Sequence, residues 1–288
     1  MTEGGNRLAE DEIDFAEWKT FEHAGWERAS NAYDDTLGKV TRQAVEQLLD
    51  LARVAAGCHV LDVATGPGYA AAAAGARGAH VIGIDFSERM IERAWWKYPG
   101  IEFRTADAEN LPFSDSIFDC VTTSFAIGQF PDSAKAISEA CRVLVFGGRF
   151  ALSHWRVNDP TKGFAMIGDA IARYGNTVEM PRGPADDRFS NRRGLVATLS
   201  RSGFDTVSTR SVELRWRVEG ADEMFEALAN GAVRVGALLR GQSRESSHAI
   251  RGRLREGLEP YRAKGAFEFP MPAILAVATK RSPHSAAS

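Results

Sequence analysis

Short apolar runs alternate with helical patterns between residues 36 and 155. The apolar runs predict strands at 60–63, 81–84, 101–104, 118–123 and 149–155. Apolar positions at helical spacing, capping residues and an alanine run predict helices at 36–56, 69–76, 87–96 and 131–145. Strands and helices that alternate in this way are typical of a parallel sheet with helices on both faces. We therefore predict an α/β fold in three layers.

The alternation loosens after residue 155. Residues 157–189 contain Pro160, Pro181 and Pro184 together with several glycines, which indicates an irregular or short-helical insertion. Beyond it the pattern predicts a helix at 191–202, a long strand at 205–218, amphipathic helices over 221–263 and a last strand at 273–279. The polar, acidic residues 1–20 predict a frayed tail.

These patterns divide the chain into a core and several additions. The predicted units are an N-terminal tail and lid (1–35), a core (36–156), a lid insertion (157–189), a core helix and strand (190–220), a helical cap (221–265), a last core strand (266–281) and a tail (282–288).

Chemically distinctive residues fall at or just after the predicted strand ends. They are Asp62, Gly66, Gly68, Asp85, Asp107 and Ser124. In open α/β sheets, ligands bind beyond the carboxyl ends of the strands. This coincidence predicts a ligand site at that edge of the sheet.

Composition and charge exclude several classes of protein. The 288 residues include 35 Lys and Arg and 38 Asp and Glu, which gives a net charge of −3. No global basic field would therefore recruit nucleic acid or an acidic membrane. No apolar run approaches the ~18 residues of a membrane span, and the acidic N-terminus is unlike a signal peptide. We therefore expect a cytoplasmic protein without stable membrane insertion.

The three cysteines are widely spaced, so they form neither a disulfide framework nor a zinc site, and no metal is expected. Cys120 and Cys141 lie in apolar runs and are interpreted as inert buried thiols.

Gly66-Pro67-Gly68 lies between a predicted strand and a predicted helix. Glycines there let the backbone turn tightly and approach a ligand closely. Asp85 ends the next strand, where a carboxylate can accept hydrogen bonds from both hydroxyls of a ribose. Taken alone, these residues also fit an ordinary turn and a helix-flanking aspartate.

Asp62 distinguishes two kinds of nucleoside ligand. A dinucleotide places its pyrophosphate on the turn, and a neighbouring carboxylate would repel it. S-adenosylmethionine carries an ammonium, a sulfonium and a ribose but no phosphate, so a carboxylate at this position suits it.

With these residues the chain resembles the class I S-adenosylmethionine-dependent methyltransferases. Residues 60–68, which read Val-Leu-Asp-Val-Ala-Thr-Gly-Pro-Gly, resemble the first motif of that family. The similarity continues through 84–87, 106–113, 118–125, 139–144 and 147–149. The subgroup it resembles most includes the ubiquinone/menaquinone-biosynthesis C-methyltransferases. Val145-Phe146 departs from the Lys-Pro usual in that subgroup, away from the cofactor motifs.

The resemblance implies a three-layer, Rossmann-like sheet of seven strands, mostly parallel, with the last strand antiparallel, plus a helical cap or lid. It also implies a site for S-adenosylmethionine, and for its product S-adenosylhomocysteine. The implied cofactor-binding residues are Asp62, Ala64, Gly66, Gly68, Asp85, Phe86, Met90, Asp107, Ala108 and Ser124.

The resemblance assigns each of these residues a part of the cofactor. The loop with Ala64, Gly66 and Gly68 would face the methionine part, and Asp62 and the Ser124 carbonyl would reach its ammonium. Asp85 would hold the ribose, with Phe86 and Met90 near the adenine. The adenine amino group would meet Asp107 and a ring nitrogen would meet the Ala108 amide.

Methyl transfer from a sulfonium is a direct displacement, so the enzyme mainly aligns the reactants and excludes water. A general base is needed only when the nucleophile arrives protonated. The catalytic candidates are His154, at the end of the fifth predicted strand, and Tyr33. His154 fits a packed strand-end histidine equally well. Tyr33 follows Trp26 in a pattern that is common in the subgroup, where such a tyrosine closes over the cofactor.

The acceptor is expected to be a small, largely apolar molecule. Aromatic residues populate the lid segments 15–35, 157–189 and 221–263, where they either line a pocket or pack onto the sheet. Ser124-Phe125-Ala126-Ile127 lacks the Pro-Pro-aromatic segment typical of enzymes that methylate nucleobase or glutamine amines, which favours O- or C-methylation. The arginines 182, 188, 192 and 193 would meet an anionic substrate group or form a solvated face.

Two other functions remain open. An NAD(P)-dependent oxidoreductase would have a Gly-x-Gly-x-x-Gly turn without Asp62, and a non-catalytic S-adenosylmethionine-binding partner subunit would keep the cofactor motifs. The sequence leaves the oligomeric state open.

Overall fold

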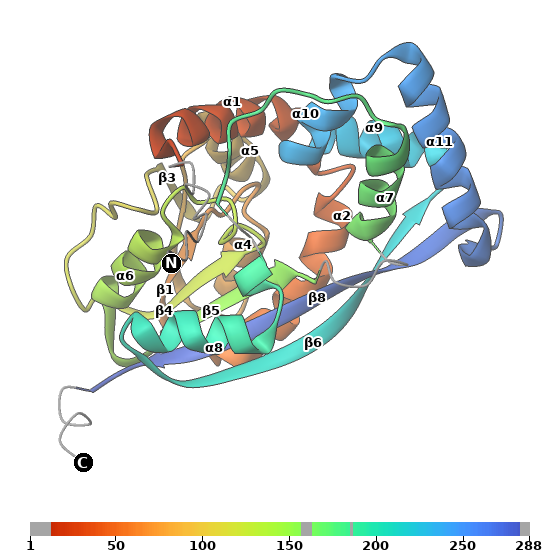
Figure 1. Cartoon of the computed structure of the whole chain (residues 1–288). Coiled ribbons are helices and arrows are strands. Elements are labelled where there is room, and N and C mark those ends of the chain that lie inside the picture. Colours follow the sequence, from red (N-terminus) through yellow and green to blue (C-terminus); the bar gives the residue numbers. More distant parts are fainter. Residues whose placement is uncertain (1–12, 157–162, 185–186, 283–288) are drawn as a thin grey trace, which may run out of the picture.

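The computed structural model describes residues 13–156, 163–184 and 187–282. Its strands form one sheet in the order β3-β2-β1-β4-β5-β8-β6, with the short β7 paired to β8 (Figure 1). The strands are β1 (His59–Val63), β2 (His80–Asp85), β3 (Glu102–Thr105), β4 (Phe118–Ser124), β5 (Leu144–Trp155), β6 (Phe204–Val218), β7 (Arg262–Ala263) and β8 (Ala266–Lys280).

The strands β1 to β5 pair in parallel, whereas β8 pairs antiparallel with both β5 and β6. The predicted fold, a mostly parallel sheet with an antiparallel last strand, is confirmed. The short β7, a strand of two residues, comes in addition to the seven predicted strands.

Helices cover both faces of the sheet (Figure 1). They are α1 (Phe15–Tyr33), α2 (Gly38–Thr41), α3 (Val45–Ala52), α4 (Tyr69–Ala76), α5 (Glu88–Lys97), α6 (Ser133–Val143), α7 (Phe164–Tyr174), α8 (Arg192–Arg201), α9 (Ala221–Gly231), α10 (Arg234–Arg240) and α11 (Arg244–Leu258). On one face, α3, α4, α7, α9 and α11 share an apolar core, and on the other face α6 and α8 share a second.

The two cores explain why the central strands carry buried apolar residues on both faces. Val60 and Leu61 are adjacent in β1, so their side chains point to opposite faces. Both are fully buried, Val60 in the first core and Leu61 in the second. A strand covered on both sides therefore appears in the sequence as a continuous apolar run.

The N-terminal segment differs from its prediction. Residues 1–12 lie outside the described part of the chain, but α1 begins at Phe15, so the predicted frayed tail is wrong for 15–20. The Asp14 carboxylate accepts hydrogen bonds from the amides of Ala16 and Glu17 at 2.9 and 3.0 Å, which caps the helix. Trp18 is buried and holds the first turns against the protein.

The insertion contains a helix, which is one of its two predicted forms, and the last strand is longer than predicted. Of 157–189, residues 157–162 and 185–186 lie outside the described residues, and α7 occupies 164–174. The last strand runs over 266–280 rather than 273–279, because it pairs with β6 as far as Phe267 opposite Val218. In Figure 1, β6 and β8 extend past the other strands toward α11.

β6 forms one edge of the sheet, and a side chain covers part of that edge. The Gln43 amide nitrogen donates to the Arg215 carbonyl at 2.8 Å, and the Gln43 amide oxygen accepts from the Arg215 N–H at 3.0 Å. Gln43 thus satisfies both backbone groups of one edge residue, as a neighbouring strand would. Across the described residues, no helix is both long and apolar enough to span a membrane.

Candidate ligand-binding cavity

A cavity of about 990 Å³, including its open mouth, lies at the carboxyl ends of β1, β2 and β4, with α1 contributing to its wall. Tyr33 and nearly all of the predicted cofactor residues line it: Asp62, Ala64, Gly66, Asp85, Phe86, Met90, Asp107, Ala108 and Ser124. Gly68 and His154 do not line it. The structure thus brings together residues that are far apart in the sequence.

Asp62 in β1 is buried and hydrogen-bonded on both oxygens. Its Oδ1 accepts from the Thr122 hydroxyl at 2.7 Å. Its Oδ2 accepts from the Thr65 hydroxyl at 2.6 Å and from the Ala71 amide at 3.2 Å. Burial raises the pKa of this carboxyl, and the hydrogen bonds oppose that rise. The surrounding donors fix the orientation of the carboxylate below the glycine turn.

The turn after β1 has left-handed backbone conformations at Ala64, Gly66 and Gly68, with φ of 54°, 53° and 87°. A Cβ on Gly68 would stand 2.8 Å from Cζ of Phe103, so glycine permits close packing there. A Cβ on Gly66 would meet no protein atom within 4 Å. Gly66 therefore borders open space in the cavity.

Asp85 ends β2 and joins the turn to the next helix. Its Oδ2 accepts from the Gly66 amide at 2.9 Å, and its Oδ1 accepts from the Ser87 amide at 2.9 Å. Burial, with smaller contributions from the charges of Asp62 and Glu27, raises the pKa of Asp85 to about 6, while the two amides oppose the rise.

Asp107 lies in a short turn after β3. Its Oδ1 accepts from the Glu109 amide at 2.9 Å, which closes the turn. Its Oδ2 accepts from Nζ of Lys19 in α1 at 2.5 Å, and the same Nζ lies 3.9 Å from Oε2 of Glu109. All three side chains line the cavity.

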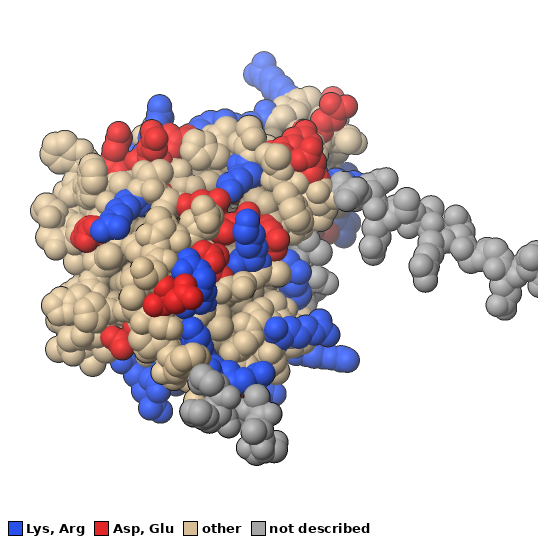
Figure 2. Space-filling view, turned by 90° about the vertical axis from the view of Figure 1, so that its left-hand side faces the viewer, with Lys and Arg blue, Asp and Glu red and all other residues tan. Residues whose placement is uncertain are grey.

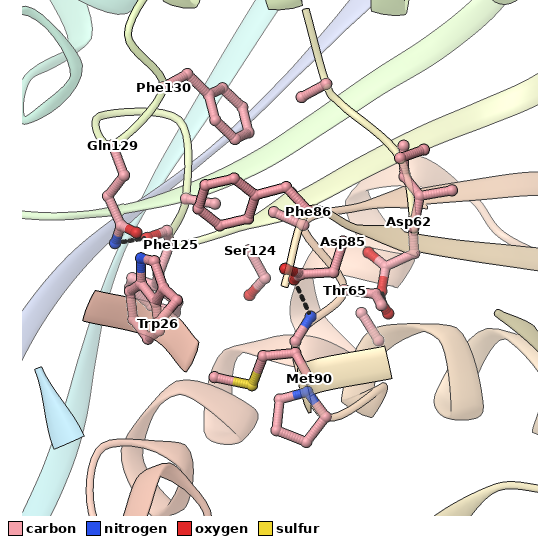
Figure 3. Close-up of a pocket in the computed structure, with 18 of the residues that line it drawn as sticks. Trp26, Asp62, Thr65, Asp85, Phe86, Met90, Ser124, Phe125, Gln129 and Phe130 are labelled. Atoms are coloured by element: carbon pink, nitrogen blue, oxygen red, sulfur yellow. Dashed lines mark hydrogen bonds between the residues drawn. The ribbon is translucent and has the colours of Figure 1, made fainter. Parts of the chain in front are cut away.

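The end of β4 forms an uncharged, partly aromatic wall. Phe125 has a left-handed φ of 57°, and its N–H donates to both the carbonyl and the hydroxyl oxygen of Ser153, at 3.0 and 3.1 Å. The Phe125 carbonyl accepts from the side-chain Nε2 of Gln129 at 3.1 Å. Figure 3 shows Trp26, Phe125 and Gln129 on one side of the cavity, with Asp62 and Thr65 on the other.

Trp26 and Tyr33 of α1 also line the cavity. Their rings meet edge to face, with centroids 5.7 Å apart. The Tyr33 hydroxyl lies 3.1 Å from the hydroxyl of Thr41, and burial raises the pKa of Tyr33 to about 12. This phenol therefore keeps its proton at neutral pH.

Four carboxyl groups line the cavity, against one lysine: Asp62, Asp85, Asp107 and Glu109, and Lys19. Such a lining favours a ligand that is cationic and rich in hydrogen-bond donors, and it disfavours a pyrophosphate. Within the described ranges, no group of three or more His, Cys, Asp or Glu side chains could hold a metal ion.

The other predicted residues lie elsewhere. His154 is buried in β5, where its ring meets the edge of Phe189 with centroids 5.8 Å apart. Of the aromatic residues in the lid segments, Phe189 and Phe225 are buried in the two cores. Arg188 donates to the Ser133 hydroxyl at 2.6 Å.

The cysteines match their interpretation in part. All three are free thiols. Cys120 is buried, which raises its pKa, but Cys141 is only half-buried.

Several lining residues were missed in the sequence. They are Lys19, Thr41, Val45, Gln129, Phe130 and Pro131. The last three follow the end of β4 closely, and that position could have indicated them. Lys19 was hidden in the predicted tail, and no local signal brings Thr41 to the site.

Comparisons with known proteins give one consistent result. A methyltransferase domain family matches residues 61–152. The demethylmenaquinone methyltransferase of Clavibacter sepedonicus is 40% identical over 136 residues, which cover 45% of this chain and 56% of that protein. The ubiquinone/menaquinone biosynthesis C-methyltransferase UbiE of Brucella anthropi is 35% identical over 176 residues, 52% of this chain and 65% of that protein. The match thus spans less than two thirds of either relative.

Solved structures share the fold at low sequence identity. The YcgJ protein of Bacillus subtilis has a TM-score of 0.57 at 21% identity and covers 83% of this chain and 99% of its own. A phosphoethanolamine N-methyltransferase of Haemonchus contortus, solved with S-adenosylhomocysteine, has a TM-score of 0.52 at 18% identity, over 84% of this chain and 52% of its own.

Proposed function

We propose, for a chain whose residues 61–152 match a methyltransferase domain family, that the protein transfers a methyl group from S-adenosylmethionine to a small, largely apolar acceptor. The observation that carries the proposal is the acidic cavity, where Asp62 and Asp85 flank the glycine turn. A cofactor with an ammonium and a sulfonium is complementary to this charge.

The residues that line the cavity fit the separate parts of this cofactor. Gly66 leaves open space beside the turn, so the methionine part can lie against the backbone. Asp85 would accept from the ribose hydroxyls and Asp107 from the adenine amino group. Asp62 would attract the ammonium from below, held in place by its hydroxyl donors.

The acceptor would lie against the wall formed by the end of β4. The lining residues from 124 to 131 are Ser124, Phe125, Ala126, Gln129, Phe130 and Pro131, and none has an ionisable side chain. When bound, the cofactor supplies an electrophilic methyl group. The aromatic walls would align a flat, apolar acceptor with it and exclude water.

The same wall constrains the nucleophile. The pKa of Tyr33 is raised to about 12, so its hydroxyl stays protonated at neutral pH and is a poor general base. Tyr33 would therefore shape the cavity rather than take a proton. The acceptor would therefore be a group that loses its proton readily, at carbon or oxygen. The name of the Brucella anthropi relative, a C-methyltransferase of ubiquinone and menaquinone biosynthesis, favours methylation at carbon.

Calorimetric titration of the purified protein with S-adenosylhomocysteine, with NAD as a parallel control, tests the proposal. We expect saturable binding of S-adenosylhomocysteine and none of NAD. The Asp85→Ala variant should bind about 1–3 kcal/mol more weakly, because a charged hydrogen-bond acceptor is lost. Binding of NAD alone would replace the proposal with a dinucleotide function.

Turnover needs a separate measurement. We would incubate the protein with S-adenosylmethionine and a panel of hydroquinones and phenols. Release of S-adenosylhomocysteine would show methyl transfer, and mass spectrometry of the acceptor would show which position is methylated. A protein that binds the cofactor but methylates no member of a broad panel would instead be a non-catalytic partner subunit.

A further inference from the structure

Lys19 reaches into the cavity from the second turn of α1. Its Nζ lies 2.5 Å from Oδ2 of Asp107 and 3.9 Å from Oε2 of Glu109. In the described lining it is the one cationic side chain among four carboxyl groups. Nothing in the proposed transfer of a methyl group requires a cation at this end of the cavity.

The contact uses one oxygen of Asp107. Oδ1 already accepts from the Glu109 amide within the turn. Oδ2 accepts from the Lys19 ammonium, so each oxygen of Asp107 already has one donor and the ammonium occupies part of the space in front of the carboxylate. An amino group that donates to Asp107 must fit beside the ammonium at this carboxylate or displace it.

The geometry points to Lys19 as an internal competitor that lowers the affinity for the cofactor. This inference rests on the proposed function, since it takes the adenine amino group as the partner of Asp107. In the free protein the ammonium satisfies Asp107, and in the complex the adenine takes its place. Loss of the ammonium would therefore tighten binding.

The exchange requires movement of one side chain rather than of α1. The neighbouring Trp18 is buried, donates from its indole to the Gln129 carbonyl at 3.2 Å, and lies under the guanidinium of Arg234 at 4.3 Å. These contacts fix the helix backbone. The Lys19 side chain is 38% exposed, so it can rotate into solvent when the ligand enters.

Titration of three variants with S-adenosylhomocysteine tests the inference. Lys19→Met removes the charge and keeps most of the stem, Lys19→Arg keeps the charge, and Lys39→Met removes an exposed lysine in α2 outside the cavity lining. A partly exposed ion pair is worth about 0.2–1 kcal/mol, so we expect Lys19→Met to bind up to about fivefold tighter. Lys39→Met should match the wild type, and Lys19→Arg, which keeps the positive charge, should bind no more tightly than the wild type.

Salt provides a second readout. Salt weakens a partly exposed ion pair, so the difference between the wild type and Lys19→Met should shrink as salt rises. An unchanged or weaker affinity of Lys19→Met would overturn the inference and make Lys19 neutral or a cofactor-binding residue. Failure of the wild type to bind S-adenosylhomocysteine would instead reject the proposed function itself.

Discussion

The charge of the Asp85 carboxylate makes ligand binding depend on pH. Its pKa is raised to about 6 by burial, and only the ionised form can accept hydrogen bonds from two hydroxyls on both oxygens. One proton must therefore leave before the ligand binds. We expect the affinity for S-adenosylhomocysteine to be constant well above pH 6 and to fall about tenfold between pH 7 and pH 5.

Calorimetry at a series of pH values measures this effect. The Asp85→Asn variant is the control, because it cannot ionise and should bind weakly with no transition near pH 6. A wild-type affinity that stays flat down to pH 5 would contradict the assignment of Asp85 to the ligand.

The two glycines of the turn should respond differently to alanine. Both have positive φ, which costs an alanine about 1–2 kcal/mol of stability. Gly68→Ala also forces a Cβ to within 2.8 Å of Phe103, which adds about 1–3 kcal/mol. Gly66→Ala meets no protein atom, so its methyl group would collide only with a bound ligand.

We therefore expect Gly68→Ala to lower the free energy of unfolding more than Gly66→Ala does. Gly66→Ala should lose affinity for S-adenosylhomocysteine while remaining folded. Denaturant unfolding and calorimetry on the same samples separate the two effects. Equal stability losses for the two variants would refute the packing argument at Gly68.

At the scale of elements, the start of α5 couples helix stability to the cavity. The Ser87 hydroxyl accepts from the Met90 amide at 3.2 Å and donates to Glu27 of α1 at 2.7 Å. Ser87→Ala should cost about 1 kcal/mol of stability through the lost cap and also weaken binding, because Phe86 and Met90 line the cavity.

A matched substitution exists far from the cavity. Ser243 caps α11 by accepting from the Ser246 amide at 3.1 Å. Ser243→Ala loses a cap of the same kind and should lower stability without changing the affinity for S-adenosylhomocysteine. If both variants lose affinity alike, general destabilisation rather than the position of Ser87 explains the result.

The elements that the sequence predicts well are those whose signals are local. The sequence predicts the helix at 69–76 with its observed bounds and places Asp62 and Asp85 at strand ends, because each signal spans a few residues. A parallel sheet then brings those strand ends together. That rule alone predicts most of the cavity lining that comes from the strand ends.

The part of the cavity lining that comes from α1 could not be predicted in this way. The polar first turns of α1 resemble a tail, and the helix is held by distant partners such as Gln129 and Asp107. The long-range contact of Lys19 with Asp107 spans 88 positions. His154 shows that a position near a strand end is not sufficient, because His154 does not line the cavity.

For the whole molecule, α1 connects several walls of the cavity. Trp18 bonds to Gln129, Lys19 to Asp107, Glu27 to Ser87 and Asp34, at the end of the helix, to Tyr69. In Figure 2 acidic and basic side chains are interspersed on one face, so the charge within the cavity matters more for recognition than a field over that surface.

Ligand binding should therefore stabilise α1 along its length. We expect added S-adenosylhomocysteine to slow amide hydrogen exchange in α1 and in the turn at 64–68, and to leave α11 unchanged. Mass-spectrometric exchange with and without the ligand measures this. Protection confined to the turn would show that the helix does not respond to the ligand.

The side chain that covers the edge of β6 bears on self-association. A strand of 15 residues at the edge of a sheet is a template on which another chain can build. Gln43 occupies both backbone groups of Arg215 and so blocks one pairing position, while Arg210, Glu213 and Arg217 place charge along the same strand. The fold thus includes protection against aggregation through its longest exposed edge, and a truncation that removes residue 43 would expose it.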